Sequence, residues 1–348
     1  MMKKTIKWFA VLSAMVMALA LVLAGCSDPS SSSNDSSGNG ATAGSSGTGN
    51  GGNSGEGGSS GIGNGSTGGS GSSSGVGNGG ETVPEGFVKV TGTIINGDET
   101  WTPTSEVFVS GRQITIPDLI VCDHEVTRGE YKEVVGSDPS KASAYDKDGN
   151  KLTGDDVLNN PVNYVNWYNA LVYCNKLSIK EGLTPCYTIS GSTDPDKWGT
   201  VPTSSNSTWT AVCDFDADGY RLPTEAEWEW LARGGENYTY AGSETVGDVA
   251  WYTSNTSDTG TREVKTKQAN GYGLYDMSGN VWEWCWDRCR SVSSSTAAAG
   301  ASSGPTRVRR GGSWYHVSSG CMVAYRNGYG PYGRYDHIGF RVVRSSSK

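Results

Sequence analysis

Histidine and cysteine are the side chains of this sequence that could bind a transition metal or act as nucleophiles, and they are few. The chain has three histidines, His124, His316 and His337. Two lie in one glycine-rich stretch and the third follows an extended run, so they give poor support to a facial iron site. Seven cysteines follow residue 82, and only Cys285 and Cys289 are close together. The sequence therefore indicates no zinc motif, and it shows no Ser-His-Asp arrangement or phosphate-binding loop.

The composition of residues 315–337 points to binding instead. This stretch contains five tyrosines, four glycines and two histidines, but no lysine, glutamate or glutamine. Tyrosine gives large amphipathic contacts at low entropic cost, and small polar residues adapt to a partner, as in antibody paratopes. A structural loop of an aromatic-rich domain is the alternative. The predicted ligand contacts are Tyr315, His316, Val317, Ser319, Gly320, Tyr325, Asn327, Gly328, Tyr329, Gly330, Tyr332, Gly333, Tyr335, Asp336 and His337.

The same positions share a pattern in the genetic code. Randomising the adenines of an AAC codon yields Asn, Tyr, His, Asp, Ser, Gly and a few others, but never Lys, Glu or Gln. All of the predicted contacts fall within that set, whereas Met322 does not. The interleaved residues are predicted to be fixed scaffold positions, namely Cys321, Ala324, Arg326, Pro331 and Arg334.

Residues 1–26 predict an export signal, with basic residues followed by an apolar run. The run ends in Leu-Ala-Gly-Cys, which resembles a bacterial lipobox and implies a lipid on Cys26. An ordinary signal peptide with an unrelated cysteine is the alternative. Residues 27–82 are rich in glycine and serine and predict a disordered tether. We expect an exported protein, anchored to the membrane through Cys26 and displayed on the outer-membrane surface.

The charge balance excludes one class of partner. The net charge is -8, and the chain has 12 Trp and 17 Tyr. Nucleic-acid binding needs clustered cations that neutralise phosphates, so it is not predicted. The remaining residues, 83–345, are enough for one large domain, which we expect to be monomeric.

Capping and periodicity predict an α+β domain with few helices. Residues 113–116 and 119–126 are predicted strands. Thr127 is expected to cap a short helix that ends at Gly136, and a second helix is expected over residues 167–177. Thr224 and Glu227 form a capping box that predicts a third helix, ending at Gly234.

Six ordered motifs resemble the formylglycine-generating-enzyme (sulfatase-modifying factor) family. They are Glu125–Thr127, Pro161–Asn163 with Trp167, Arg221–Glu229, Gly273–Trp284, Arg310–Trp314 and Gly339–Arg341. The resemblance covers residues 85–345 and implies a C-type-lectin-like fold with long loops.

The resemblance also implies chemistry to look for. Formylglycine-generating enzymes bind copper through two cysteines; here the second position matches Cys321, while His316 stands at the first. Soft Cu(I) favours two thiolates, so we do not expect that oxidase, and no cofactor is expected to be required. Oxidase or other metal-dependent oxygenase activity stays the alternative. Relatives hold a structural calcium ion at the turn that matches Gly279–Glu283, which makes Asn280 and Glu283 candidate ligands.

Residues 315–337 resemble the variable region of proteins diversified by retroelements. The flanking Arg-Gly-Gly-Ser-Trp and Ile-Gly-Phe-Arg segments would be nearly constant. The resemblance implies a surface-displayed, lipid-anchored binding protein whose variable region recognises diverse ligands, with a protein or other host or environmental macromolecule as the expected partner.

Overall fold

The computed structural model describes residues 82–205, 208–257 and 259–346. The predicted export signal, Cys26 and nearly all of the predicted tether lie outside the described residues. Across the part that is described, no helix combines the length and the apolar character needed to cross a membrane.

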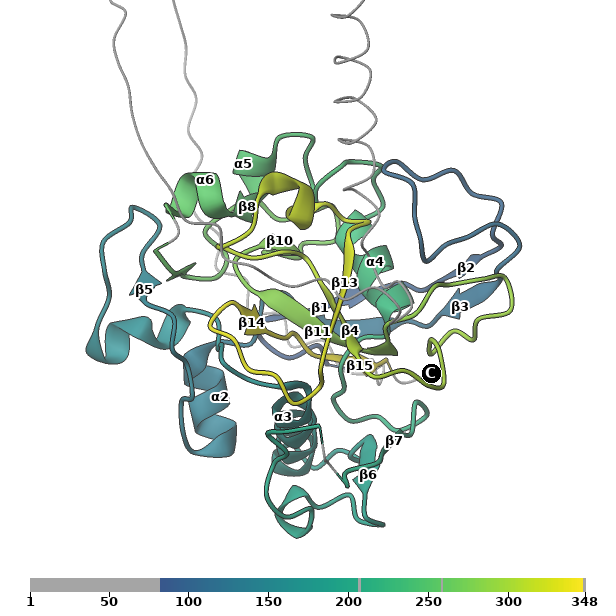
Figure 1. Ribbon diagram of the computed structural model, residues 1–348, viewed down its shortest axis with the longest axis horizontal. Helices are drawn as coiled ribbons and strands as arrows, with labels where there is room; N and C mark the ends of the chain where they lie inside the picture. The colour runs from purple at the N-terminus through teal and green to yellow at the C-terminus, as the bar shows by residue number, and fades with distance from the viewer. Residues whose placement is uncertain (1–81, 206–207, 258, 347–348) are drawn as a thin grey trace, which may run out of the picture. The chain divides into compact units, whose positions relative to one another are not determined.

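The described domain is of the α+β class, with short helices around several small sheets (Figure 1). The α-helices are α2 (Arg128–Val135), α3 (Trp167–Lys180), α4 (Glu225–Arg233), α5 (Val246–Val249) and α6 (Thr253–Thr256). The 3-10 helices are η1 (Gly154–Asn159), η2 (Pro195–Lys197) and η3 (Ser318–Cys321).

A four-stranded sheet in the order β13-β12-β11-β14 organises the C-terminal part of the domain. Its strands are β11 (Trp282–Arg288), β12 (Arg307–Arg310), β13 (Arg326–Tyr329) and β14 (Ile338–Gly339). A three-stranded sheet is formed by β1 (Phe87–Val90), β4 (Leu119–Cys122) and β15 (Val343–Ser345), in the order β1-β4-β15.

The remaining strands pair two by two. The pairs are β2 (Thr93–Ile95) with β3 (Ile114–Ile116), β5 (Ala144–Tyr145) with β9 (Thr261–Arg262), β6 (Tyr187–Ile189) with β7 (Ala211–Cys213), and β8 (Ala250–Trp251) with β10 (Ser278–Gly279).

The helix starts agree with the sequence prediction. Thr127 caps α2, because its hydroxyl accepts from the Glu130 amide while the Glu130 carboxylate accepts from the Thr127 amide. Gly136 ends that helix with a φ of 92°, a conformation that glycine adopts without strain. Thr224 and Glu227 form the same reciprocal cap on α4.

One predicted strand is too long. The sequence predicts extended backbone throughout residues 119–126, but β4 ends at Cys122. From Asp123 onward the backbone leaves the sheet, where the Asp123 amide donates to Gly86 O and the Val126 amide donates to Phe340 O. Apolar character alone does not reveal this exit.

Strand β11 has a hydrophobic core on each side. Alternate side chains of a strand point to opposite faces. Trp282 and Trp284 join the cluster built around α3, and Cys285 joins the cluster that contains Trp228 of α4. The sheet is therefore fixed between the two clusters.

Candidate ligand-binding face

The predicted variable region lies on the four-stranded sheet and beside it. It enters after β12, passes through η3, returns as β13 and then runs over residues 330–337 into β14. Figure 1 shows this yellow segment near α6 at one end and near the N-terminus of α3 at the other. Strand pairing of β12 with β13, and of β11 with β14, fixes both ends of residues 330–337.

Buried ion pairs hold β12 and β13 against α4. The Arg326 nitrogens Nε and Nη2 both lie 2.6 Å from the carboxylate of Glu225. Arg310 donates to Glu229 at 2.5 Å, and all four side chains are almost fully buried. Burial alone would raise the pKa of Glu225, but Arg326 and Arg310 hold it below its usual value. Arg326 is thus a scaffold residue in this structure, as its position between variable residues predicts.

Scaffold groups reach the variable region mainly through its carbonyl oxygens. The donor and acceptor pairs include Thr253 N to His316 O at 3.1 Å, Trp167 N to Pro331 O at 3.1 Å, Tyr164 N to Tyr335 O at 2.9 Å and Trp282 N to His337 O at 2.9 Å. Every amino acid carries a backbone carbonyl, including proline. These bonds therefore do not depend on which side chain occupies the variable position.

Five of the predicted residues come together as one aromatic surface, which we call the Tyr–His face. It consists of Tyr315, His316, Tyr329, Tyr335 and His337. Their ring centroids form a connected series, with 5.9 Å from Tyr315 to His337, 5.4 Å from His316 to His337, 5.3 Å from Tyr335 to His337 and 5.1 Å from Tyr329 to Tyr335. The Tyr329 and Tyr335 hydroxyls also lie 2.6 Å apart.

The Tyr–His face is open to solvent at its edges. Tyr315 is 56% exposed and Tyr335 is 41% exposed. Exposed aromatic rings provide contact area with few torsions to immobilise, which suits a binding surface. Val317, 61% exposed, and the exposed Ser319 lie beyond it on and beside η3.

Trp282 and Arg309 support this face from below, and the loop composition did not point to Trp282. The Trp282 ring lies 5.1 Å from the His316 ring and 6.0 Å from that of Tyr325. The Arg309 guanidinium lies 4.8 Å from the Trp282 ring and 5.2 Å from the Tyr329 ring. The sequence signal that could have identified Trp282 is its place in the Gly-Asn-Val-Trp-Glu motif.

Burial sets the charge state of the face. Burial, together with the nearby His337 and Arg309, lowers the pKa of His316 to about 3, so this imidazole is neutral at pH 7. The hydrogen bond from His337 lowers the pKa of Asp336, which is therefore ionised. Burial and the bond to Tyr335 raise the pKa of Tyr329 to about 12. The Tyr329 phenol and the His316 imidazole are therefore uncharged polar groups at pH 7.

Other predicted contacts are less available. Gly320 is buried, and Tyr325 packs partly against the core. A Cβ on Gly328 would lie 2.5 Å from Cys289 Sγ, so this glycine is needed for packing. The Asn327 amide oxygen accepts from Arg309, which turns it toward the scaffold. The half-buried residues Gly330, Tyr332 and Gly333 form the bend between β13 and the Tyr–His face.

His316 and Cys321, which stand at the two copper-binding positions of the oxidases, do not form a copper site. Cys321 is 0% exposed, its thiol lies against Val317 O at 3.9 Å, and burial raises its pKa to about 12. His316 instead contacts Ser313 Oγ at 2.7 Å and Trp282 Nε1 at 3.2 Å. A protonated buried thiol and an imidazole already engaged by the scaffold do not fit a copper ion.

Nor do the three histidines converge. His124 contacts Cys122, Asp123 and Glu130, far along the chain from His316 and His337. Within residues 82–205, 208–257 and 259–346, no group of potential metal ligands contains two of the histidines. An iron site built from them is therefore not supported.

The residues also do not fit the calcium ion that the resemblance implies. Both oxygens of Glu283 accept from Arg341, and one also accepts from Trp228 Nε1 at 2.7 Å. The Asn280 side chain donates to Glu125 and accepts from the Arg262 amide. A guanidinium already neutralises Glu283, and the Asn280 oxygen already accepts from the Arg262 amide, so these side chains do not fit a cation unless those bonds break.

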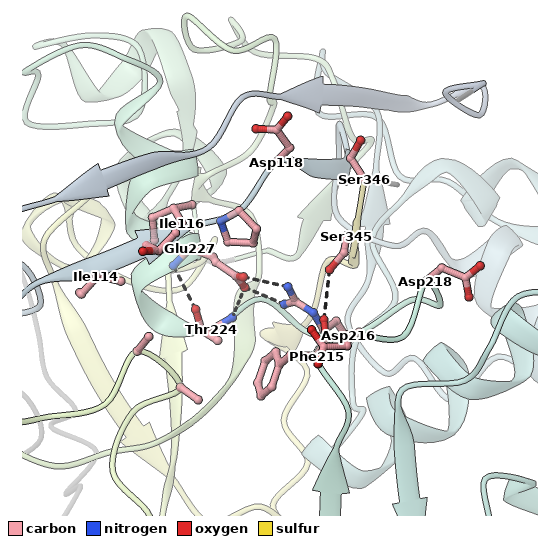
Figure 2. Close-up of a pocket in the computed structure, with 15 residues that line it drawn as sticks. Ile114, Ile116, Asp118, Phe215, Asp216, Asp218, Thr224, Glu227, Ser345 and Ser346 are labelled. Carbon is pink, nitrogen blue, oxygen red and sulfur yellow. Dashed lines mark hydrogen bonds and ion pairs between the residues drawn. The ribbon is translucent and has the colours of Figure 1, made fainter. Parts of the chain in front are cut away.

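A large cavity in the described part of the chain lies elsewhere. Its volume is about 810 Å³, and no predicted contact residue lines it. Figure 2 shows Asp118, Asp216 and Asp218 around its edge, and Thr224 and Glu227 bonded to each other within it. It is separate from the Tyr–His face in sequence and in lining residues.

Comparisons with known proteins agree with this geometry. The chaperone protein LppX of Paenibacillus barcinonensis is 35% identical over 262 residues, which cover 70% of this chain and 85% of LppX. Treponema denticola variable protein 1 superposes with a TM-score of 0.63 at 34% identity, covering 74% of this chain and 94% of that one.

Other relatives share part of the chain or a more distant likeness. CarF superposes with a TM-score of 0.56 at 25% identity, covering 76% of this chain and all of CarF. The formylglycine-generating enzyme of Streptomyces coelicolor is 37% identical over 150 residues, covering 37% of this chain. The match spans only about half of that enzyme, 48% of its length.

The family model for the sulfatase-modifying factor enzyme 1-like domain matches residues 78–346. With the capped α4, the β11 motif and the scaffold beneath β12 in place, the chain belongs to the sulfatase-modifying factor family and has its C-type-lectin-like fold.

Proposed function

We propose that this protein is a ligand-binding protein and that the Tyr–His face recognises a protein partner. The observation that carries the proposal is a connected series of aromatic rings with Tyr315 and Tyr335 exposed, on a scaffold held by buried ion pairs. Interface centres are rich in tyrosine, whereas small ligands need deep pockets. The cavity of about 810 Å³ is lined by other residues, so the Tyr–His face would meet a partner as a surface and not through that pocket.

Two relatives support this proposal by their names. Treponema denticola variable protein 1 is a variable protein, and LppX is described as a chaperone protein, which is a function that acts on other proteins. We also propose that residues 315–337 are diversified by a retroelement, which would change the exposed side chains while the interleaved scaffold residues keep their buried partners.

A matched pair of variants tests the proposal. The full chain, with Tyr335→Ser and Tyr238→Ser as variants, is used to probe an array of extracellular proteins. Tyr238 is 40% exposed and Tyr335 is 41% exposed, but only Tyr335 belongs to the face. We expect Tyr335→Ser to lose about tenfold or more in affinity for a captured protein, since interface tyrosines often contribute over 1 kcal/mol. Equal affinities for the two variants would reject the proposed face.

Diversification is tested directly by sequencing this gene from many cells of one lineage. Substitutions restricted to the codons for residues 315–337, and to template adenines, are the expected result. A uniform sequence at these codons would contradict diversification, although it would leave a fixed binding face intact.

We further propose that the protein is exported and held at the outer-membrane surface by a lipid on Cys26. The lipobox-like Leu23–Cys26 segment supports this placement. Metabolic labelling with palmitate should mark the chain but not its Cys26→Ser variant. Protease added to intact cells should remove the labelled protein, and full protection from protease would contradict surface display.

We propose no oxidase function for this chain. The support is the buried Cys321 thiol and the engagement of His316 by Ser313 and Trp282. Copper-dependent conversion of a sulfatase cysteine peptide by the purified chain would overturn this view.

A further inference from the structure

A second cluster of chemically competent side chains lies where β4 meets α2. Cys122 is the last residue of β4, and Glu130 is in the first turn of α2. His124 lies between them, with Nε2 at 3.2 Å from Glu130 Oε1 and 4.0 Å from Cys122 Sγ. The potential ligand atoms of the three residues all lie within 4.8 Å of one another. None of the three residues belongs to the Tyr–His face.

We propose that Cys122, His124 and Glu130 bind a zinc ion. A tetrahedral zinc ion with bonds of about 2.0 to 2.3 Å places its ligand atoms roughly 3.3 to 3.7 Å apart. The Nε2–Oε1 separation of 3.2 Å is close to those values, whereas the Nε2–Sγ separation of 4.0 Å is longer, so side-chain rotation that brings the thiol inward would complete the coordination. Thiolate, imidazole and carboxylate together form a donor set that zinc accepts.

The groups behind the three ligands point the correct atoms inward. Asp123 Oδ1 lies 2.5 Å from His124 Nδ1, which leaves Nε2 to act as the ligand. Lys265 holds the other oxygen of Asp123 at 2.7 Å. A carboxylate behind a histidine ligand fixes its tautomer and raises its basicity in many metal sites.

Glu130 is oriented in the same way. Its Oε2 accepts from the Thr127 amide at 2.7 Å and from the Thr127 hydroxyl at 2.9 Å, as part of the helix cap. This leaves Oε1 directed at His124. The capping box therefore does two things at once, since it starts α2 and presents one carboxylate oxygen to the metal.

A path for the ion exists beside the cluster. His124 and Glu130 line an open cavity of about 420 Å³, together with Thr127, Lys265 and other residues of the loop that follows β9. Cys122 is 1% exposed and does not line this cavity, so its thiol would bind the ion from the core side. Three protein ligands with an open side leave a fourth position for water or a small anion, as in zinc sites that are not purely structural.

The competing interpretation is an imidazolium ion held between Asp123 and Glu130 without metal. In that interpretation the Asp123 and Glu130 carboxylates neutralise the imidazolium, and Cys122 has no role. A test must therefore depend on the thiol. Co²⁺ is a suitable probe because a cobalt–thiolate bond gives a charge-transfer absorption band that oxygen and nitrogen ligands do not give.

The experiment uses the full chain, purified in detergent, stripped with a chelator and titrated with Zn²⁺ or Co²⁺. We expect one zinc ion per chain by elemental analysis and a thiolate charge-transfer band with Co²⁺. Cys122→Ser should abolish the band. Asp123→Asn should retain the band but weaken zinc binding about 10- to 100-fold, because Asp123 positions the imidazole without binding the metal.

Two matched variants serve as controls. Cys213→Ser removes a more exposed free cysteine, and Glu133→Gln removes an exposed carboxylate from α2 itself, so both should bind zinc as the wild type does. The wild-type spectrum needs no variant to fold. A wild-type chain without stoichiometric zinc or without the band would overturn the proposal, as would a Cys122→Ser variant that keeps the band.

Discussion

Substituting Glu225 by glutamine tests whether the buried ion pairs, rather than the variable side chains, carry the stability of the binding face. The substitution keeps the shape of the side chain but removes its charge. Arg326 would then stay buried at 2% side-chain exposure, facing an amide in place of the carboxylate now at 2.6 Å. Arg326 also donates to Arg290 O at 3.2 Å, but its other acidic partner, Glu106, is 3.8 Å away and 48% exposed. It cannot compensate for the loss.

The magnitude follows from this burial. Breaking a buried pair by removing one partner costs about 3 to 5 kcal/mol. In a domain of this size each kcal/mol moves Tm by about 2 to 4 °C, so a fall of roughly 6 to 20 °C is expected. Glu106→Gln, at the solvent-exposed side of the same arginine, should cost about 0 to 1 kcal/mol.

Thermal and urea unfolding of the wild type and both variants provide the measurement. The double variant Glu225→Leu/Arg326→Met should recover much of the loss, because replacing both members of a buried pair by apolar side chains is often nearly neutral. If Glu225→Gln unfolds within about 1 kcal/mol of Glu106→Gln, the reasoning is refuted. Arg326 would then not depend on its buried partner.

Three further predictions concern the variable region. Gly328→Ala should destabilise the fold by about 1 to 3 kcal/mol in urea unfolding, because its Cβ would meet the Cys289 side chain at 2.5 Å. Gly333→Ala should cost less, because its Cβ would first meet the movable Tyr329 ring. The reverse order of the two free energies of unfolding would contradict this packing. The pKa of His316 is about 3 in the folded state and about 6.5 when unfolded, so the unfolded chain takes up a proton first as the pH falls. Lowering the pH from 7.5 to 5.0 should therefore reduce the free energy of unfolding of the wild type by about 2 kcal/mol more than that of His316→Asn. Parallel pH profiles of stability for the two proteins would refute the assignment. Cys321, buried with a pKa of about 12, should resist alkylation at pH 8 in the native protein and react after unfolding; rapid native labelling would show that the thiol is accessible.

The sequence was sufficient for features that depend on local chemistry. The capping boxes at Thr127 and Thr224 and the stop at Gly136 are local backbone effects, and the structure has all of them. The sequence also predicted Arg326 to be one of the interleaved scaffold positions, and its ion pair with the buried Glu225 agrees with that role. The exit of the chain from β4 after Cys122 could not, since it depends on hydrogen bonds to Gly86 and Phe340, which are distant in sequence.

In the candidate site, too, the features set by local composition could be predicted, and those set by contacts between distant elements could not. Loop composition predicted a set of ligand contacts that includes Tyr315, Tyr335 and Gly328, but it could not reveal that Gly328 packs on Cys289. The Cys122 and His124 cluster was also missed, because its third member, Glu130, enters through the helix cap rather than through a spaced motif. Contacts between separate elements decide such cases.

The carbonyl-based attachment of the variable region has a consequence for evolution. Selection on an ordinary loop acts on folding and recognition together, so most random changes are rejected before their binding is ever tested. Here Thr253, Trp167 and Tyr164 hold atoms that no codon change can remove. Random changes at the exposed positions of residues 315–337, such as Tyr315, Val317 and Tyr335, should therefore often yield folded molecules. The rate at which new binding specificities are tested would then be limited by the mutation rate and not by the loss of folded protein.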